Sequence, residues 1–94
     1  MTTYKTQDAV LRKIGDERLL VPIKGRLAEM AHVFVLNESS SFLWEKLEAG
    51  LSTEDIYIDM ANRYRISKEQ AEKDSQLMLT TLIKDGLISP VDSE

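Results

Sequence analysis

The fold of this chain is decided by one stretch of sequence, His-Val-Phe-Val-Leu-Asn-Glu-Ser-Ser-Ser-Phe-Leu-Trp at residues 32–44. Its first five residues predict a β-strand that is apolar on both faces. Asn37 predicts a helix N-cap, because its side-chain oxygen can accept hydrogen bonds from the free amides of a first helical turn. Apolar residues then recur at helical spacing, at Phe42, Leu43, Trp44 and Leu47. A strand therefore runs directly into a helix, with β structure expected before this junction and α structure after it.

The residues before the junction predict a β-hairpin. Residues 10–14 and 18–23 are apolar runs typical of strands, and residues 15–17 (Gly-Asp-Glu) suit the turn between them. The third strand is expected at residues 32–36. Residues 1–8 are polar and show no periodicity, so we expect them to be disordered.

The residues after the junction predict three helices and a short terminal strand. The first helix is expected over residues 38–48, and the second begins at Ser52, where Ser-Thr-Glu-Asp matches a capping pattern. The third begins at Ser67 and runs to residue 85, where Gly86 ends it. Residues 87–91 are expected to form a final strand. The expected core positions of the second and third helices are Ile56, Met60, Ala61, Tyr64, Ala71, Met78, Leu79, Leu82 and Ile83.

This element order predicts the fold class α+β: a winged-helix-like domain with a three-stranded antiparallel sheet followed by three helices. Ninety-four residues suit a single domain over 1–94, with residues 1–8 and 92–94 disordered. The hydrophobic fraction of 43% and charged fraction of 30% are those of ordinary globular proteins. No apolar run approaches the ~18 residues of a membrane span, and the first residues lack a secretion signal. We therefore expect a cytoplasmic protein without a membrane partner.

The residues available for catalysis are few. The chain has no cysteine, which excludes disulfides, thiolate zinc sites and iron–sulfur clusters, and it has one histidine. We interpret Asp55 and Asp59, four residues apart on a helix, as a solvated face. The serines at 39–41 cap a helix start and lack a base partner. We therefore expect a protein that is not an enzyme and holds no metal or cofactor.

Two binding functions from different classes remain open. A winged-helix outline allows a DNA-binding regulator, with the third helix in the major groove. Residues 1–26 carry six basic and three acidic side chains, a net charge of +3, whereas residues 27–94 carry six basic and thirteen acidic ones, a net charge of −7. Acidic helices gain little from phosphate contact, so nucleic acid is not the expected partner.

The second function is recognition of a peptide. A three-stranded sheet leaves an open edge, and an extended peptide can add there as a further strand. Leu77, Met78 and Thr81 on the third helix would form the opposite wall, although Met78 also fits the buried stripe of that helix. The same edge could pair with a second copy of the chain, so a structural subunit, monomeric or homodimeric, is a third alternative.

Three groups of residues sharpen this choice: Val35-Leu36-Asn37-Glu38 with Trp44, then Ser52-Thr53-Glu54-Asp55-Ile56, and then Asp74 and Leu82 with Gly86-Leu87-Ile88. Together they resemble the PqqD family, also described as the precursor-peptide recognition element of ribosomally made, post-translationally modified peptides. The resemblance covers roughly residues 10–90. It implies a non-catalytic adaptor, or peptide chaperone, that binds the leader of a precursor peptide and presents it to a modifying enzyme, often a radical S-adenosylmethionine (radical SAM) enzyme.

The resemblance also implies where the leader would bind. In the family it adds antiparallel to the third strand and lies in the groove between that strand and the third helix. Ser75 departs from the family, which often carries an aliphatic residue there, and it is expected at the groove floor. The matching positions are Val33, Phe34, Val35 and Leu36 on the strand side and Asp74, Leu77, Met78 and Thr81 on the helix side.

Overall fold

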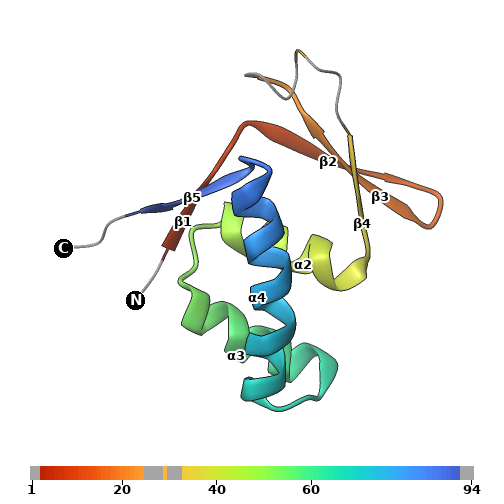
Figure 1. Cartoon of the computed structure of the whole chain (residues 1–94). Helices are drawn as coiled ribbons and strands as arrows, with labels where there is room; N and C mark the ends of the chain where they lie inside the picture. Colours follow the sequence, from red (N-terminus) through yellow and green to blue (C-terminus); the bar gives the residue numbers. More distant parts are fainter. Residues whose placement is uncertain (1–2, 25–28, 30–32, 92–94) are drawn as a thin grey trace.

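The computed structural model describes residues 3–24, 29 and 33–91 (Figure 1). It is an α+β structure with a three-stranded antiparallel sheet and three helices, which confirms the expected fold class. The elements, in chain order, are β1 (Thr3–Thr6), β2 (Ala9–Ile14), β3 (Glu17–Pro22), β4 (Phe34–Leu36), α2 (Glu38–Glu48), α3 (Thr53–Tyr64), α4 (Lys68–Lys84) and β5 (Ile88–Val91).

The three-stranded sheet has the order β2-β3-β4, and β4 is one of its edges. The expected hairpin is formed by β2 and β3, which meet at the Ile14↔Glu17 pair. Gly15 has a φ of 61°, which a two-residue hairpin loop requires at its first position and which glycine adopts without strain. The third strand was expected over residues 32–36. It is observed at Phe34–Leu36, and His32 lies outside the described residues.

A second, two-stranded sheet was not expected. Strand β1 pairs antiparallel with β5, in a register that places Tyr4 opposite Pro90 and Thr6 opposite Ile88. The expectation of disorder over residues 1–8 is therefore wrong for Thr3–Thr6. The expected terminal strand is present as β5, and it needs a partner for its backbone groups. A polar segment can supply that partner, because ladder hydrogen bonds use main-chain atoms and need no apolar pattern.

The three helices begin at the predicted caps. The side chain of Asn37 accepts a hydrogen bond from the Ser40 amide (2.8 Å), which satisfies a first-turn donor of α2. Ser52 and Ser67 do the same for α3 and α4, accepting from the amides three residues further on. Helix α2 thus starts at Glu38, one residue after its cap, and the strand-to-helix junction predicted from residues 32–44 is confirmed for the described part.

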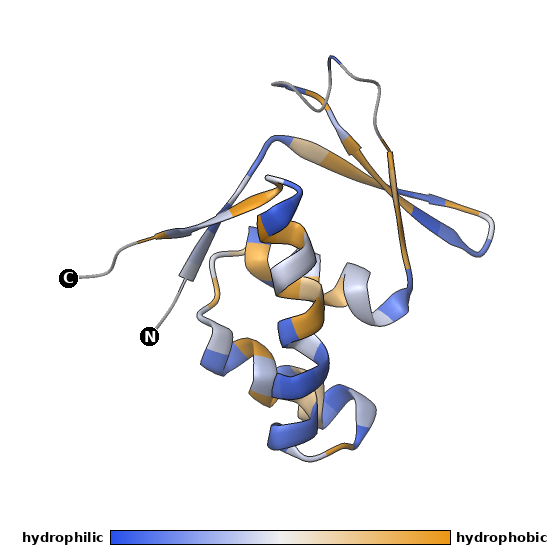
Figure 2. Cartoon of the chain, viewed as in Figure 1, coloured by the Kyte–Doolittle hydropathy of each residue, from blue (hydrophilic) through white to orange (hydrophobic). Residues whose placement is uncertain are grey.

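The core lies between the helices and the inner face of the three-stranded sheet. Figure 2 shows hydrophobic and hydrophilic residues alternating along the helices. Leu20 of β3, Leu36 of β4 and Trp44 of α2 are buried together with residues of all three helices. Full burial of such a side chain stabilises the fold by about 1.5–3 kcal/mol. None of the helices formed by the described residues is long and apolar enough to cross a membrane.

The core face of α4 differs from the prediction at two positions. Ile83 was expected in the core but is 41% exposed, because Leu82 occupies the inward position of that turn. Ser75 is buried instead, and its hydroxyl donates to the Met60 sulfur of α3 (3.0 Å). Ser75 therefore faces α3, and the expectation that it lies at the groove floor is wrong. Ala61, Tyr64 and Met78 are only partly buried and pack against the edge of the core.

Candidate functional site

An open cavity of about 370 Å³ lies between α4 and the junction of β4 with α2. We call it the groove. All four residues predicted for the helix side line it, and they come from successive turns of α4. Three residues from the start of α2 complete the lining. The lining residues are Asn37, Ser39, Ser40, Asp74, Leu77, Met78 and Thr81.

The α4 wall of the groove is a single helix face, since its residues follow the spacing i, i+3, i+4 and i+7. Leu77 is 73% exposed and Met78 is half-buried, so the middle of this wall is apolar. Asp74 accepts a hydrogen bond from Gln70 Nε2 (2.9 Å). The Thr81 hydroxyl donates to the Leu77 carbonyl (3.1 Å), which holds its methyl group and oxygen in one orientation.

The residues predicted for the strand side flank the groove and do not line it. Leu36 is 5% exposed and Phe34 packs against the core, whereas Val35 between them is 71% exposed. This alternation directs the Leu36 side chain into the core, so only its main chain remains for a ligand. Val33, just before the strand, is 45% exposed. The edge of β4 opposite β3 has no neighbouring strand among the described residues.

Sequence reasoning assigned Asn37, Ser39 and Ser40 to helix capping alone and missed them as groove residues. All three residues line the groove. They also belong to the helix cap, where the Ser39 hydroxyl donates to the capping oxygen, Asn37 Oδ1 (3.0 Å). One signal could have found them. The strand passes into the helix without a loop, so residues at the helix start must lie at the end of the edge strand.

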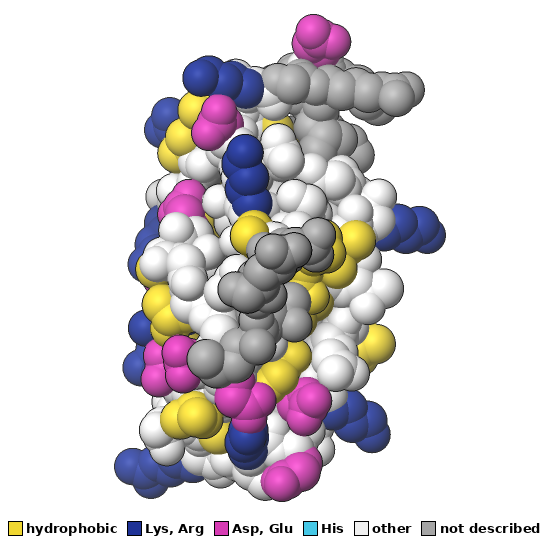
Figure 3. Space-filling view, turned by 90° about the vertical axis from the view of Figure 1, so that its left-hand side faces the viewer, with side chains coloured by type: hydrophobic (Ala, Val, Ile, Leu, Met, Phe, Trp, Pro, Cys, Tyr) yellow, Lys and Arg dark blue, Asp and Glu magenta, His cyan; other side chains and the backbone are white. Residues whose placement is uncertain are grey.

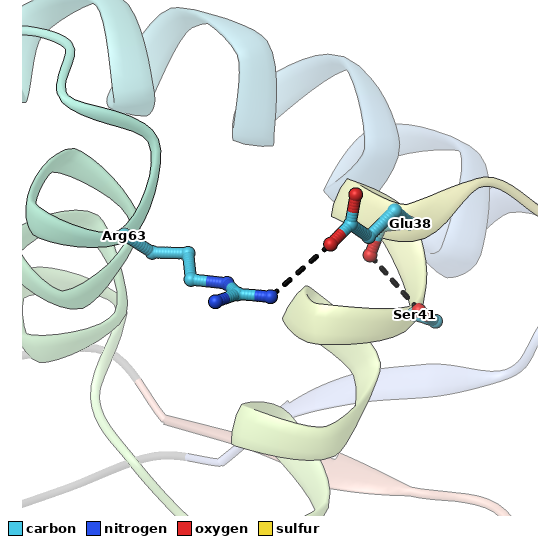
Figure 4. Close-up of polar contacts among 3 residues, drawn as sticks. All are labelled: Glu38, Ser41 and Arg63. Atoms are coloured by element: carbon cyan, nitrogen blue, oxygen red, sulfur yellow. Dashed lines mark hydrogen bonds and ion pairs between the residues drawn. The ribbon is translucent and has the colours of Figure 1, made fainter.

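The start of α2 is tied to the neighbouring helix by an ion pair. Arg63 of α3 donates to Glu38 Oε1 at 3.1 Å, and the Ser41 hydroxyl donates to the Glu38 carbonyl at 2.9 Å (Figure 4). The side chains of the ion pair are both 56% exposed, so its contribution to stability is small, below about 1 kcal/mol. It links the groove end of α2 to α3.

A second cavity, of about 380 Å³, lies on the opposite side of α4, where Tyr4 of β1 and Tyr57 of α3 approach the helix. Burial raises the pKa of the Tyr57 hydroxyl, and the nearby carboxylate of Glu72 raises it further. Hydrogen bonds with Thr53 and Gln76 oppose this shift. Tyr57 is therefore held as a neutral phenol that links α3 to α4.

Several basic side chains of the described helices lie beside acidic ones. Figure 3 shows basic and acidic side chains interspersed over the side on which β1 and β5 lie. Lys46, Arg63 and Lys68 of the helices are paired with Asp59, Glu38 and Glu54. Within the described part of the chain, no three His, Cys, Asp or Glu side chains are placed to hold a metal ion.

Comparison with known proteins agrees with this architecture. A solved structure of TbiB1 in complex with the TbiA(beta) leader peptide superposes with a TM-score of 0.76, covering 95% of this chain and 99% of that one at 24% sequence identity. At this identity the likeness shows the shared fold. No curated protein sequence matches the chain. Residues 17–88 match the family described as coenzyme PQQ synthesis protein D (PqqD). Because the match spans more than half of the sequence, the chain belongs to the PqqD family.

Proposed function

We propose that this protein is a non-catalytic adaptor that binds the leader of a ribosomal precursor peptide and presents it to a modifying enzyme. The leader adds antiparallel to the edge of β4 that has no neighbouring strand among the described residues, in the space between β4 and α4. The antiparallel direction continues the pattern of the sheet, in which both existing pairings are antiparallel. Membership of the PqqD family supports this function, as does the fold shared with TbiB1, which is solved with a leader peptide.

The observation that carries the proposal is the exposure of two apolar side chains. Val35 on β4 (71%) and Leu77 on α4 (73%) are the most exposed large apolar residues among those described. They flank the same groove from two different elements. Single exposed apolar side chains are ordinary on protein surfaces. An interaction site is favoured here because Leu77 and Met78 line the same groove that Val35 flanks. A peptide strand beside β4 would cover both.

The expected affinity follows from the terms of strand addition. Four or five main-chain hydrogen bonds contribute about 1 kcal/mol each. Ordering a disordered leader costs about 2–5 kcal/mol, so apolar contacts with Val35, Leu77 and Met78 must provide most of the net binding free energy. We expect a Kd on the order of 0.1–10 μM.

Because the chain resembles the PqqD family, we propose that the modifying enzyme is a radical SAM enzyme. The adaptor would bind the leader and leave the rest of the precursor free for that enzyme. A reconstituted reaction tests this: modification of the precursor by its enzyme should fall strongly when the adaptor is omitted. Equal modification without the adaptor would contradict the presenting role while leaving peptide binding intact.

The groove itself is tested by titrating isotope-labelled protein with the leader of a precursor encoded beside this gene. Saturable amide shifts should concentrate on residues 33–36 and 74–82. Thr81→Arg fills the groove and should weaken binding at least tenfold, about 1.4 kcal/mol. Thr80→Arg is the matched control, because Thr80 makes the same kind of hydroxyl-to-carbonyl bond but lines the opposite cavity.

Val35→Pro tests the strand edge in the same titration. Proline removes a main-chain donor of β4, so binding should weaken while circular dichroism stays native-like. Val35→Thr keeps the donor and the β-branched shape and should lose less affinity than the proline variant. If Val35→Pro and Thr81→Arg both fold and bind the leader as the wild type does, the groove assignment is wrong.

A further inference from the structure

Asp74 is the one residue with an ionisable side chain among the described residues that line the groove. Its neighbours on the wall are Leu77, Met78 and Thr81, and across from it stand the amide of Asn37 and two serine hydroxyls. Gln70 holds one of its carboxylate oxygens by a hydrogen bond of 2.9 Å. The groove thus has an anionic end and an apolar middle on a single helix face.

The directions of β4 and α4 decide the order in which a bound peptide passes the groove residues. In Figure 1, β4 descends toward the start of α2, whereas α4 ascends toward β5. A peptide antiparallel to β4 therefore runs in the same direction as α4. Along its length it passes Asp74 first, then Leu77 and Met78, and then Thr81.

The spacing of these residues is within about 2 Å of the spacing along an extended strand. From Asp74 to the midpoint of Leu77 and Met78 the helix rises about 5 Å, and successive same-face residues of a strand are about 6.7 Å apart. A peptide side chain that faces Asp74 is thus followed, two residues later, by one that faces Leu77 and Met78. The net charge of this part of the chain acts in the same sense, since residues 27–94 carry six basic and thirteen acidic side chains.

We infer that the groove selects leaders in which a lysine or arginine lies two residues before an apolar residue, with Asp74 as the specificity-determining contact for the cation. This inference rests on the proposed strand addition and adds a chemical class of ligand to it. The apolar residue supplies affinity against Leu77 and Met78. The cation fixes the register, because a slip of one residue along β4 would turn it to the other face of the sheet.

A position scan of synthetic peptides tests the inference. The leader used in the titration above is made with glutamine at every charged position, and a single lysine or glutamate is then placed at each position in turn. At one position, two residues before an apolar residue, lysine should lower Kd about threefold relative to glutamine and glutamate should raise it by a similar factor. The preference should shrink between about 20 mM and about 500 mM NaCl, since the pair is exposed.

Asp74→Asn should abolish the lysine preference at that position, because asparagine keeps the acceptor for Gln70 and loses the charge. Glu72→Gln removes the same charge from the opposite side of α4, where Glu72 lines the second cavity, and should leave the preference intact. A lysine scan that is flat across all positions, or a preference that survives Asp74→Asn, overturns the selection while the groove assignment stands. Failure of every peptide, including the unaltered leader, overturns both.

Discussion

The two faces of α4 use similar residues in different ways. One face, formed by Ala71, Ser75, Leu79 and Leu82, is buried against α3 and the rest of the core. The other, formed by Asp74, Leu77, Met78 and Thr81, lines the groove. Both follow the same helical spacing, and each carries leucine. Leu82 is 1% exposed and Leu77 is 73% exposed.

This difference separates stability from recognition on one helix. A leucine in the core face stabilises the fold through burial, whereas Leu77 has little burial to lose. Leu77 lines the groove beside Met78, so we attribute its role to an intermolecular contact. The same substitution made on the two faces should therefore have opposite consequences.

Leu82→Ala should have the largest effect. Removing a fully buried leucine leaves a cavity and lowers the free energy of unfolding by about 2–5 kcal/mol. Guanidinium chloride unfolding at neutral pH measures this loss. Leader affinity, determined at a temperature where the variant is folded, should stay within twofold of the wild type. A stability loss below about 1 kcal/mol would mean that α4 is not packed as described.

Leu77→Ala makes the same change on the groove face and should give the reverse result. The free energy of unfolding should change by less than about 0.5 kcal/mol, as for other exposed substitutions. The Kd for the leader should rise about threefold to tenfold, because the apolar middle of the groove is lost. Ile58, on α3 and 44% exposed, provides the control: Ile58→Ala should alter neither quantity. Unchanged leader binding in Leu77→Ala would remove the distinction between the two faces.

The smallest effect is expected at Tyr57, which lines the second cavity on the side of α4 opposite the groove. It is a dependence of the free energy of unfolding on pH. Because the pKa of Tyr57 is raised in the folded protein, the unfolded chain releases the phenolic proton first as pH increases. The stability that Tyr57 contributes as a neutral phenol is therefore complete below pH 10.0, the ordinary pKa of a tyrosine, and is lost as the pH rises through the raised pKa of the folded protein. Unfolding of wild type and Tyr57→Phe on both sides of this value should show a smaller alkaline loss in the variant. Equal losses would exclude Tyr57 as the cause.

Much of the fold was accessible to prediction because its signals are local. The caps at Asn37, Ser52 and Ser67 are set by residues within one turn, and the hairpin follows from Gly15 between two apolar runs. Strand β1 was missed because its partner, β5, lies at the other end of the chain and its own residues are polar. Pairing over that distance leaves no pattern in either segment.

The candidate site was predicted in part. The four α4 residues came from helical spacing and the family resemblance, and the structure brings them together in one groove. Of the residues predicted for the strand side, Phe34, Val35 and Leu36 form β4 and Val33 lies just before it. None of the four lines the groove, Leu36 points into the core, and Asn37, Ser39 and Ser40 were overlooked. Whether a strand residue faces the core or solvent depends on register, and Leu36 lies opposite Arg18 only because of how β3 and β4 pair.

The sequence by itself determined the three helices with their caps and the β2–β3 hairpin, because caps, turns and apolar periodicity act over a few residues. It did not reveal β1. It also determined the apolar character of Val35 and Leu77. Only the tertiary structure decided that these two side chains remain in solvent on either side of one groove while Leu36 and Leu82 do not. Burial depends on which surfaces meet, and contacts between residues far apart in the chain settle that.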